Sequence, residues 1–275
     1  MMQIAVVITT YNRPDALERA LSAYCVQDDL DIELLVADDG STADTRSVVA
    51  QFAARAPFPV RHVWHEDRGF RAGAIRNRAV AATSADYVVF TDGDCVPLAG
   101  FVRNHRRLAE PGWFVAGNRM LLSRTFTDRV LAVPPVALED LPAAEWARRF
   151  LRRDVNRLAP LWHIGLGDPL GWRKAQPTRW LGAKSCNLGV WRADLVRVNG
   201  FDNAYSGWGL EDSDLVIRLL HAGVRHKNGR FGTPLAHLWH ADNDRSRLAE
   251  NRSRLDALVA SDRIRAEDGL EQHAD

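Results

Sequence analysis

Short apolar runs alternate with amphipathic stretches in the amino-terminal third of the chain. The apolar runs are rich in β-branched and aliphatic residues, which is typical of buried strands, and they lie at 4–9, 32–37, 60–64 and 86–91. Helices are expected between these runs, beginning near Pro14, Thr42 and Arg71. Strands that alternate with helices at this spacing predict an α/β fold, in which helices cover both faces of a mostly parallel sheet.

Polar residues follow three of the predicted strands at the point where each strand ends. Residues 9–12 read TTYN, residues 38–41 read DDGS, and residues 92–94 read DGD. The carboxyl ends of parallel strands share one edge of a sheet, and open α/β sheets bind their ligands there. Turn chemistry alone would explain DDGS, but three polar loops at one edge favour a ligand site.

Asp92 and Asp94 are the most informative pair at this edge. Residues two apart on an extended chain project to the same side, so two negative charges are held close together. Proteins bind Mg²⁺ or Mn²⁺ with one or two carboxylates, and substrate phosphates complete the coordination. The pair therefore predicts a divalent-metal site that also binds a phosphate-bearing ligand.

A second group of candidate residues lies in the stretch GWGLEDSDLVIRLLHAG, where a helix is expected from about Leu210 to Gly223. On a helical projection, the apolar side holds Asp212 together with Leu215, Val216, Leu219 and Leu220. The opposite side holds Glu211, Asp214, Arg218 and His221. A buried aspartate in the first turn is costly unless it has a task, and the helix dipole helps to keep it ionised. Asp212 is therefore the candidate general base.

In this order and combination, the motifs closely resemble family 2 glycosyltransferases of the GT-A fold. The resemblance rests on VVITTYNRPDAL, LLVADDGSTADT, RGFRAGAIRNRAV and FTDGDCVP, while GFDNAYSGWGLEDSDLVIRL resembles the carboxy-terminal region of β-1,4-galactosyltransferase-like enzymes. It covers nearly all of residues 3 to about 243 and is least specific between about 121 and 180. It implies one GT-A domain with a nucleotide-sugar-binding half at 1–120 and an acceptor-binding, catalytic half at 121–243, followed by a helix and tail at 244–275.

On the donor side, the resemblance implies that Thr9 and Tyr11 bracket the base and ribose and that Asp39 hydrogen-bonds the base. Arg76, in the IRN that matches the family's ARN, would face the nucleotide or its diphosphate. The family usually has Asn where this chain has Arg68, so it stays open which of Arg68, Arg71 and Arg76 reaches the phosphate.

The resemblance also implies a division of labour around the metal. Asp92 would reach the ribose, or the metal through water, and Asp94 would ligate the metal directly. His240 would complete the metal site, and its imidazole favours Mn²⁺ over Mg²⁺. His237, which we expect on the other face of the same short strand, is the weaker candidate.

For the acceptor side, the resemblance assigns proton removal from the acceptor hydroxyl to Asp212. Glu211 would orient the acceptor or donor sugar, and Trp208 would offer a flat face to a sugar ring, with core packing as its alternative role. One base without a matching nucleophile implies a single displacement with inversion. The expected enzyme is a metal-dependent hexosyltransferase of polysaccharide biosynthesis that transfers sugar from a UDP-sugar to a hydroxyl of a glycan or a lipid-linked saccharide.

Two other classes share part of this pattern. A nucleotidyltransferase would share the sheet and the carboxylate metal site, but it would prefer a glycine-rich phosphate loop after the first strand, where this chain has TTYNRP. A nucleotide-sugar-binding module without transfer would not need Asp94, Asp212 and His240 together.

Composition bears on partners and location. The formal net charge of +1 over 275 residues gives no general attraction to nucleic acid. Three cysteines at unrelated spacings, and an apolar start too short for a signal peptide, favour a cytoplasmic enzyme. Residues 145–184 are a local exception, with nine Lys or Arg against three Asp or Glu. The basic helix expected at 145–162 would either contact the inner face of an anionic membrane or pack on the domain, and the tail at the carboxyl terminus is expected to be loose.

Overall fold

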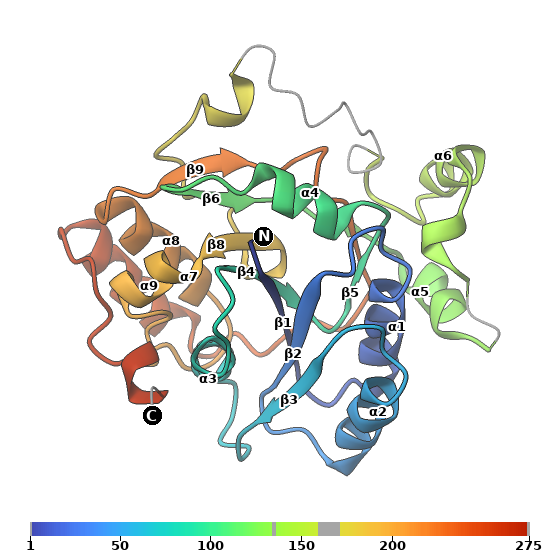
Figure 1. Cartoon of the computed structure of the whole chain (residues 1–275), viewed down its shortest axis with the longest axis horizontal. Coiled ribbons are helices and arrows are strands. Elements are labelled where there is room, and N and C mark those ends of the chain that lie inside the picture. The colour runs from blue at the N-terminus through green and yellow to red at the C-terminus, as the bar shows by residue number, and fades with distance from the viewer. Residues whose placement is uncertain (1, 134–135, 159–170, 274–275) are drawn as a thin grey trace.

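A twisted central sheet organises the computed structural model, which describes residues 2–133, 136–158 and 171–273 (Figure 1). Among these residues the sheet has seven strands in the order β3-β2-β1-β4-β8-β6-β9. The strands are β1 (Ile4–Thr10), β2 (Ile32–Asp38), β3 (Val60–Trp64), β4 (Tyr87–Asp92), β6 (Trp113–Ala116), β8 (Leu188–Trp191) and β9 (Arg225–Asn228). The strands β1 to β4 are mutually parallel, and β8 runs antiparallel to both β4 and β6.

Alternate residues of the parallel strands serve two different cores, which explains their continuous apolar sequence. On one face, Ile8 and Val36 pack with the helices α1 (Pro14–Tyr24) and α2 (Ala43–Ala53). On the other face, Val7 and Leu35 pack with α3 (Ala72–Ala81), α7 (Arg192–Val198) and α8 (Glu211–His221). The predicted strands and the first three predicted helices are therefore confirmed, with bounds that differ by about one residue.

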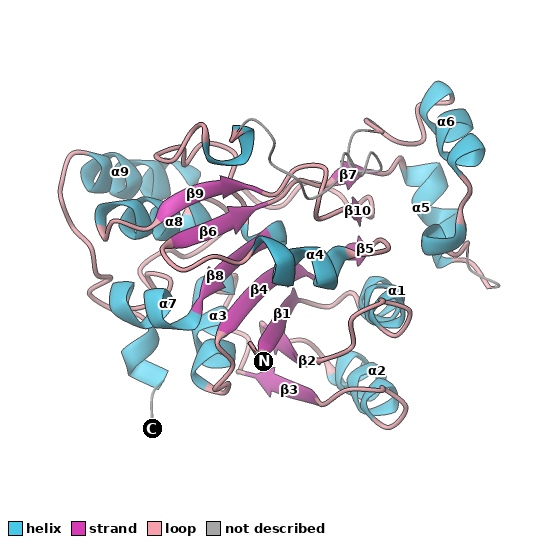
Figure 2. Ribbon diagram, turned by 45° about the horizontal axis from the view of Figure 1, so that its top comes forward, coloured by secondary structure: helices cyan, strands magenta, loops and turns pink. Residues whose placement is uncertain are grey.

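A smaller second sheet, in the order β5-β10-β7, meets the first sheet just after β4 (Figure 2). It consists of β5 (Cys95–Pro97), β7 (Met120–Leu121) and β10 (Leu235–His237). The chain passes from β4 to β5 through Gly93, whose amide donates to the Thr9 carbonyl oxygen at 2.7 Å. A side chain on Gly93 would collide with Thr10, so the close approach of these strands requires glycine here. Asp92 and Asp94 thus lie where the two sheets join.

The remaining helices are α4 (Phe101–Leu108), α5 (Arg124–Leu131), α6 (Ala143–Leu151) and α9 (Leu248–Val259). No helix in the part of the chain that the structure describes has both the length and the apolar character needed to cross a membrane.

The prediction of a basic helix over 145–162 is wrong about the length of the helix. The helix α6 ends at Leu151, Arg153 takes a positive φ of 61°, and the chain then turns so that Val155 bridges to Leu122. Arg149 is buried, where it pairs with carboxylates on both sides and lies 4.5 Å from the ring centre of Phe126. The part of the expected helix at 159–162 lies outside the described residues. The chain therefore presents a shorter basic surface than the sequence predicted.

The expectation of a loose carboxy-terminal tail is also wrong. After α9 the chain folds back past α7, where the Ala266 amide donates to the Val198 carbonyl oxygen at 3.1 Å, and Asn199 binds this segment at two further points. The Asn199 side-chain amide donates to the Ala266 carbonyl oxygen at 2.9 Å, and its side-chain oxygen accepts from the Glu271 amide at 2.9 Å. Leu270 is buried in the main core. A charged segment can pack in this way because a few apolar and amide contacts anchor it while its charges stay at the surface.

Candidate active site

A single buried arginine joins three of the segments that the sequence singled out. Arg76 is only 4% exposed, and its Nε donates to Thr9 Oγ1 at 2.9 Å. Its two terminal nitrogens donate to Asp92 Oδ1 at 3.2 Å and to Glu211 Oε1 at 3.1 Å. Its guanidinium also lies 5.3 Å from the ring centre of Phe201. Arg76 therefore ties the ends of β1 and β4 to the first turn of α8.

The charges around Arg76 shift one another's protonation. Burial, reinforced by the neighbouring Asp212 carboxylate, raises the pKa of Glu211 above its usual range, although Arg76 opposes this shift. Burial disfavours the charge on Arg76, but the carboxylates of Asp92 and Glu211 outweigh it and raise the pKa of the guanidinium. Arg76 is therefore a permanent positive charge at the centre of the site.

A second cluster lies beside this network, at the junction of the two sheets. The Nε2 atoms of His237 and His240 each lie 3.5 Å from a different oxygen of Asp94. One ligand atom from each residue falls within 4.8 Å of the others, which is the spacing that a shared metal ion requires. Among the described residues, Asp94 Oδ1 is buried without a hydrogen bond, as expected of an oxygen that binds a cation.

These residues also have the right chemistry for a metal. One carboxylate and two imidazoles suit Mn²⁺ better than Mg²⁺, which prefers oxygen ligands. Burial lowers the pKa of His237 and so favours the neutral imidazole that can ligate. Burial also raises the pKa of the adjacent Cys95 thiol, which disfavours the thiolate and makes Cys95 a poor ligand.

The prediction that His237 lies on the other face of its strand, away from His240, is wrong. The strand β10 ends at His237, so the two-residue periodicity of a strand does not extend to His240. In the antiparallel pair with β5, His237 lies opposite Cys95, and the Leu238 amide donates to the Asp94 carbonyl oxygen at 2.8 Å. This pairing, which the sequence does not reveal, brings both histidines to Asp94.

On the side of the predicted nucleotide site, Tyr11 and Asp39 lie at the ends of β1 and β2. Tyr11 is 48% exposed, and its hydroxyl donates to Asp67 at 2.9 Å. Asp39 is buried, lies 2.6 Å from His65 Nε2 and accepts from the Arg71 amide at 2.8 Å. An exposed aromatic ring beside an oriented carboxylate is a suitable surface for a planar base.

The other two arginines of this region hold a loop. Arg68 pairs with the Glu66 carboxylate at 2.8 Å, and Arg71 donates to the Glu66 carbonyl oxygen at 2.6 Å. Of the three arginines, only Arg76 contacts other predicted site residues through its side chain. Trp208 is half-buried, and Arg245 lies 5.1 Å from its ring centre.

The prediction of which residues of α8 are buried and which face solvent is wrong. Asp214 and Arg218, expected on the open side, are fully buried and pair at 2.6 Å, while Asp212 is half-buried. The reason is that α9 covers the side expected to face solvent, where Ile217 packs with Leu255 and Leu258. Asp212 therefore remains a candidate base through its accessibility rather than through burial.

The sequence analysis missed three polar residues near the site. His65 lies against Asp39, Asp67 binds Tyr11, and Arg119 lies 4.0 Å from Asp92 on the side away from Arg76. His65 directly follows β3, so the strand-end rule applied to a fourth strand would have found it. Arg119 lies beside β7, whose pairing with β10 has no signal in the sequence.

Comparisons with known proteins relate the chain to characterised families. A family model described as glycosyl transferase family 2 matches residues 5–171, and another described as the N-terminal domain of galactosyltransferase matches residues 176–240. The chain is 30% identical over 226 residues to validoxylamine A glucosyltransferase of Streptomyces hygroscopicus subsp. jinggangensis, which covers 80% of this chain and 52% of that protein. The chain thus spans about half the length of this relative.

Two solved structures share the fold. A mannosyltransferase of Pyrobaculum calidifontis, in complex with GDP-Man and Mn²⁺, superimposes with a TM-score of 0.62 at 20% identity, over 94% of this chain and 64% of that one. Residues 1–349 of TarS from S. aureus, in complex with UDP, superimpose with a TM-score of 0.62 at 15% identity, over 99% of this chain and 68% of that one.

Proposed function

This chain belongs to glycosyl transferase family 2 and has the GT-A fold, and on that premise we propose that it is a metal-dependent, inverting hexosyltransferase. The proposed donor is a UDP-sugar, and the proposed acceptor is a hydroxyl of a glycan or of a lipid-linked saccharide. The observation that carries the proposal is the meeting of Asp94, His237 and His240 beside the network that Arg76 forms with Glu211.

Asp94, His237 and His240 are the residues that would hold the metal. A bound Mn²⁺ would neutralise the charge that grows on the departing diphosphate. Asp92 lies beside this cluster and binds Arg76, and it would contact the ribose, or the metal through water. Tyr11 would stack on the base, and Asp39 would accept a hydrogen bond from a base N–H, as its ionised carboxylate can only accept. Thr9, held by Arg76, would complete the donor site.

Asp212 is the proposed general base for the acceptor hydroxyl. It is half-buried and therefore accessible, and it lies in the first turn of α8. Glu211 is buried and bound to Arg76, so it would orient a sugar and not accept the proton. One base without a nucleophile on the opposite face gives inversion in a single displacement.

The experiment that tests the proposed function measures UDP release from a panel of UDP-sugars. With Mn²⁺ present, the wild-type chain should release UDP from at least one of them, and removal of the metal with a chelator should abolish release. Variant Asp256→Ala, on the exposed side of α9, serves as a control and should keep full activity. Tight binding of UDP-sugars without turnover, in the presence of a saccharide acceptor, would instead identify a binding module.

A peripheral membrane contact would use the exposed Arg148, Arg152, Arg153 and Arg157, and not the buried Arg149. We keep it as a proposal for a lipid-linked acceptor. The support for this membrane contact is the positive charge of this short surface.

A further inference from the structure

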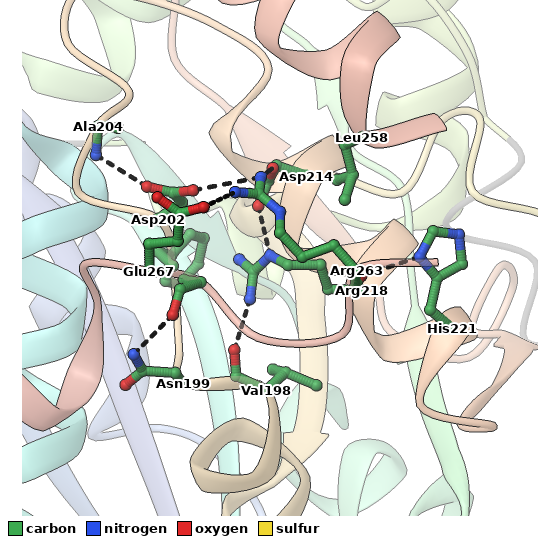
Figure 3. Close-up of polar contacts among 12 residues, drawn as sticks. Val198, Asn199, Asp202, Ala204, Asp214, Arg218, His221, Leu258, Arg263 and Glu267 are labelled. Atoms are coloured by element: carbon green, nitrogen blue, oxygen red, sulfur yellow. Dashed lines mark hydrogen bonds and ion pairs between the residues drawn. The ribbon is translucent and has the colours of Figure 1, made fainter. Parts of the chain in front are cut away.

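Four charged side chains join the first turn of α8 to the segment that follows α9 (Figure 3). Asp214 and Arg218 are fully buried, and Arg218 Nε donates to Asp214 Oδ1 at 2.6 Å. Arg218 also donates to the Val198 carbonyl oxygen at 2.7 Å, which ties this pair to the end of α7. Arg263 approaches from the carboxy-terminal segment, and its Nη2 lies 3.5 Å from Asp202 Oδ2 and 3.6 Å from Asp214 Oδ2.

Arg263 balances the charge of this cluster. With it, two carboxylates face two guanidinium groups. Without it, Asp214 keeps Arg218, but Asp202 is a buried carboxylate without a cation among the described residues. Burial raises the pKa of Asp214, and the nearby charge of Asp202 adds to that shift. Two buried carboxylates that face each other without a shared cation repel, and the structure around them must move to relieve the repulsion.

We expect this movement in the first turn of α8, because the residues at the start of the helix do not stabilise that turn by themselves. Leu210 precedes the helix with a positive φ of 78°, which is strained for a bulky residue, and its side chain makes no cap hydrogen bond. The entry of the chain into α8 is therefore held by tertiary contacts. Two residues of this turn are anchored from outside, Glu211 by Arg76 and Asp214 by Arg263, and Asp212 lies between them.

The backbone that carries Arg263 is itself well anchored. Its carbonyl oxygen lies 2.9 Å from His221 Nδ1 at the end of α8, and Asn199 binds the same segment at Ala266 and Glu271. Arg263 is 32% exposed, so its side chain reaches the buried carboxylates from the surface. Replacement of the Arg263 side chain should therefore leave the fold intact while it changes the charge balance around Asp202 and Asp214.

We propose that Arg263 is a positioning residue for Asp212, because it neutralises Asp202 and Asp214 and thereby fixes the first turn of α8. The inference rests on the proposed function, since it bears on sugar transfer through the role of Asp212 as base. Its structural part, that the first turn of α8 depends on Arg263, stands separately.

The test compares Arg263→Met and Arg263→Lys with the matched control Arg265→Met. Arg265 belongs to the same segment, but it pairs with the exposed Glu271 and donates to the carbonyl oxygens of Val196 and Arg197 in α7. Hydrogen–deuterium exchange of the amides at 214–217, which are the first to donate within α8 and so report on its first turn, should be at least about tenfold faster in Arg263→Met than in the wild type, and unchanged in Arg265→Met. Arg263→Lys keeps the charge and should restore most of the protection. Equal exchange in Arg263→Met and the wild type would overturn the proposal.

The kinetic arm uses UDP-glucose as donor probe, Mn²⁺ and UDP release. Arg263→Met should lower kcat by about tenfold, because a small displacement of a catalytic group is costly, while the Kd of UDP with Mn²⁺ should stay within about twofold. A parallel loss of kcat and UDP affinity would indicate general damage and overturn the positioning role. If the wild-type chain releases no UDP from any nucleotide sugar, the proposed function fails, while the exchange result still decides the role of Arg263.

A compensating variant tests the role of charge itself. In the double variant Asp202→Asn with Arg263→Met, the uncompensated negative charge is gone, and the Asn oxygen can still accept from the Ala204 amide as Asp202 does at 3.0 Å. Slow exchange at 214–217 should return in this double variant. A double variant no better than Arg263→Met would show that charge balance is not the cause and would overturn the proposal.

Discussion

Arg76 joins three segments of the candidate site. The resemblance implies that it faces the nucleotide or its diphosphate, and in the structure it donates to Thr9, Asp92 and Glu211. A buried guanidinium with its donors directed at three groups orients the carboxylates around it. Arg76 thus contacts both the proposed donor site and the first turn of α8.

Replacement of Arg76 should therefore damage the fold itself. In Arg76→Ala, Asp92 and Glu211 lose their shared cation, and the free energy of unfolding should fall by about 3–5 kcal/mol, as is usual when one partner of a buried ion pair is removed. Arg68→Ala, at a side chain that is 70% exposed, should change it by no more than about 0.5 kcal/mol. Urea unfolding measures both values. Equal losses in the two variants would contradict the central place of Arg76.

At the residue scale, the proposed role of Asp212 as the general base gives a second prediction. Asp212→Asn keeps the shape of the side chain but removes its basicity, so kcat should fall by roughly 10²–10⁴ while UDP affinity and the midpoint of thermal unfolding stay unchanged. Steady-state kinetics and calorimetry separate these effects. If Asp212→Asn keeps activity within a few-fold of the wild type, the base is Glu211, because Asp214 is fully buried in its pair with Arg218.

At the scale of elements, the sequence correctly predicted the strands and helices that depend on continuous apolar runs. It did not predict features that depend on packing between elements far apart in the chain. The strands β1 to β4 and the helices between them follow from local periodicity, and so does the delivery of Thr9, Asp92 and Asp94 to one edge. The faces of α8 do not, because α9 arrives from residues 248–259 and buries the polar side. The pairing of β10 with β5, which brings His237 to Asp94, likewise depends on residues about 140 positions apart.

The packing of α4 against the second half of the chain depends on a buried histidine. His105 Nε2 lies 3.0 Å from Asn187 Oδ1, and the Asn187 amide donates to the carbonyl oxygens of Asn118 and Thr233, both at 2.9 Å. Burial lowers the pKa of His105 from 6.5 to about 4. The unfolded chain therefore binds more protons than the folded chain between these two values, so stability falls as the pH drops through this window.

This shift predicts a specific pH dependence. Between pH 7 and pH 5 the protonation of His105 in the unfolded state should cost the wild type about 2 kcal/mol of folding free energy. His105→Gln has no group that titrates at this position, so its loss over the same interval should be smaller by about that amount. Urea unfolding at both pH values gives the comparison. Identical losses in the wild type and His105→Gln would show that His105 does not titrate as its burial indicates.

At the scale of the whole molecule, the proposed active site lies where two sheets and one helix from distant parts of the chain meet. The large sheet supplies Asp92, the small sheet supplies the residues around Asp94, and α8 supplies Glu211 and Asp212. Arg76 connects the large sheet to α8, and the contacts of Arg263 connect α8 to the carboxy-terminal segment. The arrangement predicts that donor binding depends on the small sheet, while catalysis depends on the position of α8.

Calorimetric titration of UDP in the presence of Mn²⁺ tests the central claim, that the cluster around Asp94 holds the metal that binds the donor. The wild-type chain and the surface control Asp256→Ala should bind UDP with the same affinity, and this binding should require Mn²⁺. In Asp94→Ala the diphosphate loses its bridge to the protein, so Mn²⁺-dependent binding should disappear while the unfolding midpoint stays near that of the control. Wild-type affinity for UDP and Mn²⁺ in Asp94→Ala would contradict the account.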